Sequence, residues 1–433
     1  MTRLVHRRRP SLENLTERIR ASLWFTPTVM VAVSLATLAL LLRLDEQQHD
    51  LPELLAFSGD PKAARDIAST IAGAMMGFIG VVFSITVVAL QLASSQFSPR
   101  ALRGFLRDRL TKVTLGAYVS TLAYALLLIR HVDGSGVVVP DLAMTGLFVL
   151  TLGSIALFIA YIDHISHSIR AVNIIETIAA ELRSAIVDDL RPYETEPLGI
   201  DPSHDPFSDD GPLLHHDAAG AVLVHVDRSE LANAARRHGC VIELLVRGGS
   251  FVRAGAAVAR VHGLAPGAQL PAAEVAAAMS FDVERTMQDD LSFGLRQLVD
   301  IALRALSPGV NDPTTAVQAI DRIHDALALL ATRADPDPWI RGDDGHPRAW
   351  IPVASWSDRV SLALDEIRVA GRGSLQVQRR LLALLDDLLE HAPAGRRPPL
   401  QTQRDAVERA VLETFPDPLD RAAAATADMI GIG

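Results

Sequence analysis

Residues 68–100 read ASTIAGAMMGFIGVVFSITVVALQLASSQFSPR, and this stretch decides the fold. No charged residue interrupts the sequence between Asp66 and Arg100. A helix of this length, at about 1.5 Å per residue, extends about 50 Å, which exceeds the roughly 30 Å hydrocarbon core of a bilayer. The stretch therefore predicts a membrane-crossing helix that continues past the membrane surface until Pro99 ends it.

One side of this helix carries small and polar residues that fall within an arc of roughly 80° at 100° per residue. We call them the polar stripe: Thr70, Gly73, Gly77, Gly80, Ser84, Val88, Gln91, Ser95 and Ser98. The stripe has two interpretations. Small residues let neighbouring helices approach closely and pack, whereas polar groups inside a membrane commonly line a water-filled path. The pattern alone leaves both open.

Four apolar spans occur in the first part of the chain: Leu23–Leu42, Ile67–Ala93, Val113–Ile129 and Leu142–Ile162. Each is near or above the length that a membrane-crossing helix needs. We therefore predict an α-helical membrane protein with four transmembrane helices. The remaining chain predicts a cytoplasmic region with a small β-containing module and an α-helical C-terminal part.

The distribution of basic residues predicts the orientation. Arginines concentrate in the N-terminal arm and in the connection between the second and third spans, whereas the connection from His131 to Pro140 has no Arg or Lys. We expect both termini to be cytoplasmic. The connection after Pro99 is also basic and amphipathic, which predicts contact with anionic lipids through Arg100, Arg103, Arg107 and Arg109.

Five segments are expected along the chain. Residues 1–22 form an N-terminal arm with an interfacial helix, 23–170 the transmembrane domain, and 171–217 a helical extension and linker. Residues 218–265 form the β-containing module, and 266–433 form a helical domain. The fourth span is expected to run without a break into the helix that follows it.

Asp163, His164 and His167 fall within one helical turn at the predicted inner membrane surface. Three interpretations stay open for this inner-interface polar cluster. The side chains hold a metal ion, form a pH-sensitive pair, or make hydrogen bonds between helices.

Charged residues of alternating sign recur at Arg285, Asp289, Arg296, Asp300 and Arg304, which predicts a salt-bridged face on one helix. Pro308 and Gly309 end that helix, and Asp312 with Pro313 predicts the N-cap and first residue of the next. The corner between them carries Arg304, Ser307, Asn311, Asp312 and Thr314. Such a corner serves as a helix cap or binds an ion through exposed backbone groups.

Several function classes are disfavoured. A net charge of −10 argues against nucleic-acid binding as the main role. The single cysteine, Cys240, excludes an intramolecular disulfide and a cysteine-based metal site. The chain has no nucleophile elbow, P-loop, HExxH or dinucleotide-binding motif. We therefore predict no enzyme activity, no catalytic residue, no cofactor and no bound metal.

Four segments together resemble a family of bacterial membrane proteins called DUF2254. They are FSITVVALQLASSQFSPRALRGFLRD (83–108), YIDHISHSIR (161–170), RTMQDDLSFGLRQLVDIALRALSPGVNDPTTAVQAIDRI (285–323) and LALDEIR (362–368). The resemblance runs in order over almost the whole chain. It implies a multi-pass protein of the bacterial inner membrane with a cytoplasmic region.

The leading functional hypothesis is a homo-oligomeric, channel-like or transport protein in which the second span lines the path. Its pore-lining candidates are Gly73, Gly77, Gly80, Ser84, Val88, Gln91, Ser95 and Ser98. The alternative is a membrane-anchored sensor or scaffold whose cytoplasmic region binds a partner or a small ligand.

Overall fold

The computed structural model describes residues 2–4, 24–47, 59–96, 109–135, 139–168, 170–193, 207, 211–342 and 344–429. The chain divides into two compact units. One unit comprises residues 10–173, and the other comprises residues 1–9 together with 174–433. The first unit is therefore inserted into the second in the order of the sequence.

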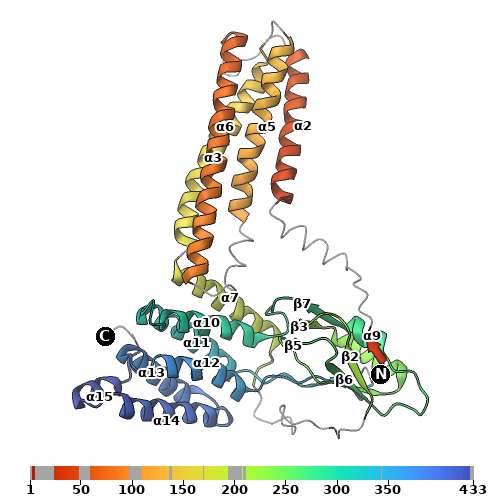
Figure 1. Ribbon diagram of the computed structural model, residues 1–433, viewed down its shortest axis with the longest axis vertical. Helices are drawn as coiled ribbons and strands as arrows, with labels where there is room; N and C mark the ends of the chain where they lie inside the picture. Colours follow the sequence, from red (N-terminus) through yellow and green to blue (C-terminus); the bar gives the residue numbers. More distant parts are fainter. Residues whose placement is uncertain are drawn as a thin grey trace. The chain divides into compact units, whose positions relative to one another are not determined.

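The first unit consists of long apolar helices lying side by side (Figure 1). They are α2 (Phe25–Gln47), α3 (Pro61–Gln96), α5 (Arg109–Ser135) and α6 (Asp141–Ser168). In the described part of the chain, these four helices are long and apolar enough to cross a membrane. The four predicted spans are confirmed to this extent.

Helix α5 is the central helix of this unit, because it packs against α2, α3 and α6. In the apolar segment of α5, 56% of the residues are buried, whereas the corresponding share is 17% to 22% in the other three helices. Helix α3 packs against this bundle through one row of mostly small side chains. The row consists of Ala64, Ala68, Ala72, Met75, Val82 and Ala89, all buried.

The fourth span does not run unbroken into the next helix, so that prediction is wrong. Helix α6 ends at Ser168 and α7 (Ala171–Asp189) begins three residues later. The backbone carbonyl of His167, at the end of α6, accepts a hydrogen bond from the Arg170 amide (3.2 Å) and another from the Asn173 side chain (2.5 Å). These bonds satisfy a terminal carbonyl of α6.

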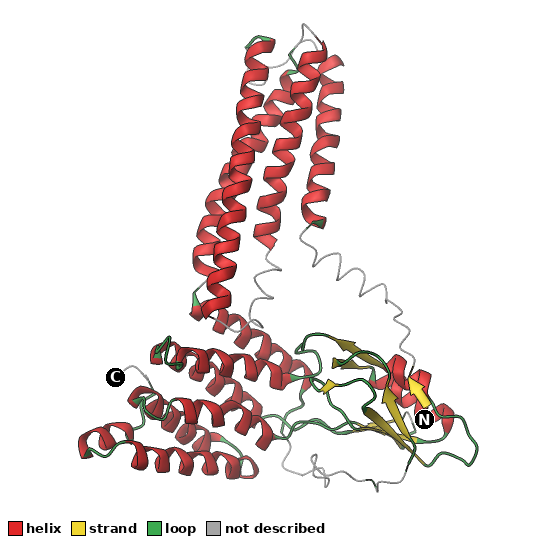
Figure 2. Cartoon of the chain, in the orientation of Figure 1, coloured by secondary structure: helices red, strands yellow, loops and turns green. Residues whose placement is uncertain are grey.

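The second unit contains two β-sheets (Figure 2). The larger has the strand order β1-β2-β6-β4-β9-β8, and the smaller has the order β5-β3-β7. The strands are β1 (Thr2–Leu4), β2 (Leu213–His216), β3 (Ala221–Val226), β4 (Val241–Leu244), β5 (Phe251–Val252), β6 (Ala257–His262), β7 (Met279–Asp282), β8 (Trp339–Arg341) and β9 (Pro347–Trp350). The larger sheet thus takes strands from the N-terminal arm and from the C-terminal region, outside residues 218–265.

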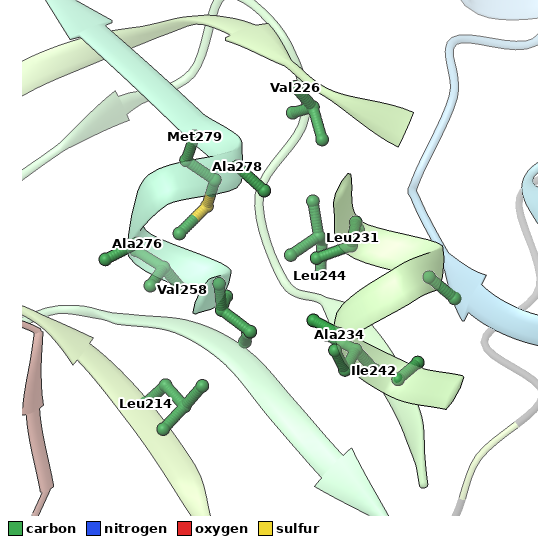
Figure 3. Packing of buried hydrophobic residues seen from close by; sticks show 14 of the residues in the cluster. Leu214, Val226, Leu231, Ala234, Ile242, Leu244, Val258, Ala276, Ala278 and Met279 are labelled. Atoms are coloured by element: carbon green, nitrogen blue, oxygen red, sulfur yellow. The ribbon is translucent and has the colours of Figure 1, made fainter. Parts of the chain in front are cut away.

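Helices α8 (Arg228–His238) and α9 (Ala272–Ala278) pack with the strands around one hydrophobic core (Figure 3). Leu231 and Ala234 of α8 face Ile242 and Leu244 of β4 in this core. Asp227 caps α8 by accepting a hydrogen bond from the Glu230 amide, and Gly239 ends the helix with a left-handed φ of 62°. These local signals position α8 against the sheet.

The rest of the second unit is helical. It contains α7, α10 (Leu291–Ala305), α11 (Pro313–Ala331), α12 (Trp356–Ala370), α13 (Leu375–His391), the 3₁₀ turn η1 (Ala394–Arg396), α14 (Arg397–Thr414) and α15 (Pro418–Ala424). Helix α10 packs against α11 and α12, and α14 packs against α12 and α13. Ion pairs Glu176–Arg322 (2.8 Å) and Arg183–Asp325 (3.2 Å) join α7 to α11.

Candidate functional site

The polar stripe faces away from the other helices of its own unit. Gly73, Gly77, Gly80, Ser84, Val88 and Gln91 are all exposed. A Cβ atom added at any of the three glycines would have no heavy atom of the described chain within 4 Å. Gly77 lies two residues after the buried Met75, and two residues turn a helix by about 200°, which puts the stripe opposite the packing face. The described part of the stripe therefore does not pack against the described helices of this unit.

Two members of the stripe lie where their side chains are not described. Ser95 is within α3, which extends to Gln96, but only its backbone is described. Ser98 lies outside the described residues, as do Arg100, Arg103 and Arg107 of the predicted lipid-binding segment. Arg109, the first residue of α5, is exposed. The roles of these residues remain predictions.

A set of hydroxyl groups inside the four-helix unit was not predicted from the sequence. Tyr118 of α5 donates a hydrogen bond to the Ser154 carbonyl (3.2 Å), and the Thr121 hydroxyl bonds the Ser154 hydroxyl (3.0 Å). Tyr124 donates to the Ala143 carbonyl (2.8 Å). These three α5 residues recur at intervals of three and so lie near one face of the helix. This spacing is the sequence pattern from which the polar contacts could have been predicted.

A similar bond joins α3 to α6. The hydroxyls of Thr86 and Tyr161 lie 2.7 Å apart, and both also bond the Val82 carbonyl. Tyr161 is fully buried. Hydrogen bonds between helices stabilise bundles in apolar surroundings, where no water competes for the polar groups. The apolar interior of this unit therefore contains hydroxyl groups that hydrogen-bond between helices.

The inner-interface polar cluster is loosely arranged. The Nδ1 atom of His167 lies 3.5 Å from an Asp163 carboxylate oxygen and 2.8 Å from the Asp163 carbonyl oxygen. Both side chains are more than half exposed. Throughout the described residues, no three His, Cys, Asp or Glu side chains are grouped as a metal ion would require. The cluster forms a local helix-end contact at the last turn of α6.

The alternating charges do not all lie on one helix, so that prediction is wrong in part. Helix α10 begins at Leu291, after Arg285 and Asp289. The predicted salt-bridged face exists only in its later part, where Arg296 pairs with Asp300 (2.7 Å) and with Glu366 of α12. Earlier in the series, Asp289 accepts hydrogen bonds from the His225 side chain (2.9 Å) and the Val226 amide (2.8 Å).

Arg285 pairs instead with Asp290, the residue before α10. Its Nε lies 3.0 Å from the Asp290 carboxylate, which is 8% exposed. Burial raises the pKa of Asp290, and the neighbouring Arg285 opposes that shift. The two glycines at positions 248 and 249 lie directly against residues 289 and 290. The pair is buried at Asp290 and partly exposed at Arg285, and it lies against the loop after β4 at the start of α10.

The corner between α10 and α11 has the predicted geometry. Asp312 is the N-cap of α11, with Pro313 at the first helical position, and its carboxylate accepts from the Thr315 amide (3.0 Å) and hydroxyl (2.5 Å). Asn311 has a φ of 48°, a left-handed conformation that Asn tolerates. The Ser307 hydroxyl donates to the Arg304 carbonyl (2.7 Å). Cap bonds thus occupy both carboxylate oxygens of Asp312.

The other two corner residues lie at the two helix ends. Arg304, at the end of α10, and Thr314, in the first turn of α11, are both exposed. A ligand role for this corner stays a prediction.

Comparison with known proteins identifies relatives of the chain. The profile of a family described as "Predicted membrane protein (DUF2254)" matches residues 20–387. The chain is 35% identical over 435 residues to "Uncharacterized protein Mb1321c" of Mycobacterium bovis, and equally to "Uncharacterized protein Rv1290c" of Mycobacterium tuberculosis. Each alignment covers 97% of this chain and 81% of the relative. No solved structure matches.

The family match covers all four apolar helices and most of the second unit, and the resemblance inferred from the four sequence segments is confirmed. The chain belongs to the DUF2254 family of predicted membrane proteins.

Proposed function

We propose that this membrane protein is a homo-oligomeric, channel-like protein in which the polar stripe of α3 faces a path shared between copies. The observation that carries the proposal is the outward direction of the stripe. A Cβ atom added at any of its three glycines would meet no heavy atom within 4 Å beyond the nearby backbone of its own helix, although the opposite face of α3 is packed.

The chemistry of the stripe disfavours lipid as its neighbour. Gln91 and Ser84 are exposed on a helix that is otherwise apolar over a membrane-crossing length. Hydrocarbon cannot satisfy an amide or a hydroxyl, so such side chains face protein or water. The glycines supply the close approach or the open space that either neighbour requires.

Two arrangements of copies satisfy this requirement. In the first, stripes from several copies surround water and form a path. In the second, two stripes pack against each other through Gly73 and Gly77, which have the spacing of the GxxxG dimer motif. We favour the first because Ser84, Val88 and Gln91 extend the stripe with larger side chains beyond the glycines.

The test is ion flux through the purified full-length protein in liposomes, with K⁺ and Cl⁻ release measured separately. Ser84→Leu should reduce flux to the background of empty vesicles without changing the oligomer mass in detergent. Phe83→Leu is the matched control, because Phe83 is the next residue, is 66% exposed and lies outside the stripe. This control should conduct like the parent protein.

Three results would contradict the proposal: no flux from the parent protein, unchanged flux in Ser84→Leu, or a monomeric mass. A tight vesicle with an intact oligomer would favour the packed dimer and a role as a membrane-anchored sensor or scaffold.

A further inference from the structure

A cavity of about 200 Å³ is lined by residues of α12, of the segment just after it and of α14 in the second unit. Figure 1 labels both helices. Its α14 side consists of Ala406, Arg409, Ala410 and Glu413, which share one face of the helix. Its other side consists of Arg368, Val369 and Arg372, at and just beyond the end of α12. The two alanines leave the space open, and three arginines surround it.

Two of these arginines have carboxylates nearby at distances too long for hydrogen bonds. Arg368 lies 3.7 Å from Asp365, and Arg372 lies 3.8 Å from Glu413. Other arginines of the same helical layer pair closely, as Arg404 does with Asp386 at 2.6 Å. Since a contact beyond about 3.5 Å is not a hydrogen bond, the guanidinium donors facing these carboxylates are largely unused.

Arg409 is the third arginine, and it is exposed. In the part of the chain that the structure describes, no carboxylate oxygen lies within 4.0 Å of its guanidinium. It does not belong to the last turn of α14, so it does not neutralise the carbonyls at that helix end. Arg409 therefore brings to the cavity a positive charge that no described carboxylate pairs with, while Glu413 of the same lining lies near Arg372.

The donor set fits an oxyanion. Each guanidinium presents five N–H donors in a planar fork that matches phosphate and carboxylate oxygens, and two elements contribute forks from opposite sides. A phosphate group offers several acceptor oxygens and about two negative charges, which suits more than one arginine. The cavity is smaller than the roughly 300 to 1,000 Å³ of pockets for drug-sized ligands, so the ligand is small.

We propose that this cavity, which we call the arginine pocket, binds a small ligand that carries phosphate groups, either a free phosphorylated molecule or the headgroup of a lipid. The proposal does not rest on the channel hypothesis, because the arginine pocket lies in the second unit and contains no residue of α3.

The test uses the full-length protein in nanodiscs of phosphatidylcholine, with inorganic pyrophosphate as the probe and calorimetry as the readout at constant ionic strength. The parent protein should bind pyrophosphate. Arg409→Gln should raise its Kd by about tenfold or more, because it removes charged hydrogen bonds. Arg341→Gln is the matched control, since it removes the same charge from an exposed arginine of the same unit outside the pocket, and it should leave the Kd unchanged.

A second variant, Ala410→Leu, fills the pocket without changing the charge and should also weaken binding. The proposal is overturned if the parent protein does not bind pyrophosphate, or if Arg409→Gln binds it as tightly as the parent. Equal weakening in Arg409→Gln and Arg341→Gln would also overturn it, because the attraction would then be general to the surface.

Nanodiscs that contain phosphatidylglycerol separate the two sources of phosphate. If a lipid headgroup occupies the pocket, pyrophosphate should bind the parent protein more weakly in these nanodiscs, and Arg409→Gln should lack that difference. If the ligand is a free molecule, the Kd should be the same in both kinds of nanodisc.

Discussion

Gly249 is the residue at which the loop after β4 meets the buried Arg285–Asp290 pair. Its φ is 82°, and a Cβ atom there would lie 2.1 Å from the Asp290 carboxylate and 2.7 Å from the Arg285 guanidinium. Gly267 has nearly the same φ, 80°, with no heavy atom of the described chain within 4 Å of an added Cβ. The two glycines therefore have nearly the same φ and differ in the atoms that surround them.

We therefore predict that Gly249→Ala destabilises the second unit more than Gly267→Ala does. Gly267→Ala should cost about 1–2 kcal/mol through left-handed strain alone. Gly249→Ala should cost about 1–3 kcal/mol more, because it displaces a buried hydrogen-bonded carboxylate. Native-state hydrogen exchange of the α10 amides measures the difference, and equal protection in the two variants would contradict the prediction.

His324 is a buried histidine with a charged partner at each ring nitrogen. Its Nδ1 accepts a hydrogen bond from Arg380 (3.0 Å), and its Nε2 donates to Asp387 (2.8 Å). Arg380 in turn binds Asp321 (2.6 Å). Burial lowers the pKa of His324 below its ordinary value, although Asp387 opposes the shift.

This lowered pKa predicts that acid loosens the packing of α11 against α13. The unfolded state binds the proton more readily, so the contribution of His324 to stability is complete above about pH 6.5 and is lost as the pH falls through the folded pKa. Amide protection in α11 and α13 should therefore decrease from about pH 7 to about pH 5. His324→Gln should flatten this dependence, whereas His346→Gln, which changes an exposed histidine of the same unit outside α11 and α13, should not. The same pH dependence in all three proteins would refute the assignment.

At the scale of elements, α6 is capped by a neighbouring helix. The two carboxylate oxygens of Asp45, on α2, accept hydrogen bonds from the Leu142 amide (2.9 Å) and the Ala143 amide (3.1 Å) in the first turn of α6. The N-terminal cap of α6 thus comes from a residue that is distant in the sequence. The contact fixes the end of α2 to the start of α6.

Asp45→Ala should therefore destabilise the four-helix unit by about 1 kcal/mol, the usual cost of a lost N-cap. Asp45→Asn should retain most of the stability, since an amide oxygen still accepts a hydrogen bond. Amide exchange in the first turn of α6 is the local readout. If the amides in the first turn of α6 exchange at the parent rate in both Asp45→Ala and Asp45→Asn, the cap does not stabilise the unit.

Elements with local signals could be predicted from the sequence. The four spans follow from apolar length, and the α11 N-terminus follows from Asp312 and Pro313. Strands β8 and β9 have no such signal, because they are short and β9 pairs in parallel with β4, with Ala349 opposite Ile242. The start of α10 was misplaced because the spacing from Arg285 to Arg304 fits a helix, whereas Arg285 bonds Asp290 across a turn.

The candidate site divides in the same way. The sequence places the polar stripe of α3 on one face, but it does not say which face of α3 packs. Both the polar stripe and the buried row that contains Ala64, Ala68 and Ala72 include many small residues. The arginine pocket was missed because its two sides come from segments about 40 residues apart, Arg368–Arg372 and Ala406–Glu413, that only tertiary packing brings together.

At the scale of the whole molecule, the second unit is discontinuous in sequence. Strand β1 pairs in parallel with β2, with Thr2 opposite Leu214, and covers one edge of the larger sheet. Deleting residues 1–9 should expose that edge and increase amide exchange in β2 while leaving α2, α3, α5 and α6 unchanged. Arg3→Ala keeps the strand backbone and should exchange like the parent protein. Unchanged exchange in the deletion variant would show that β1 does not protect the sheet.

The pairing of β1 with β2 also sets an order for synthesis. Leu214 follows Thr2 by 212 residues, which at about 5–20 residues per second takes a ribosome about 10 to 40 s. All four apolar helices emerge in that interval, so the translocon acts on them before the sheet can close. Because paired strands must lie on one side of a bilayer, the finished sheet requires an even number of crossings. A nascent chain in which one helix failed to insert would leave β1 and β2 on opposite sides of the bilayer, and its sheet would keep an open edge.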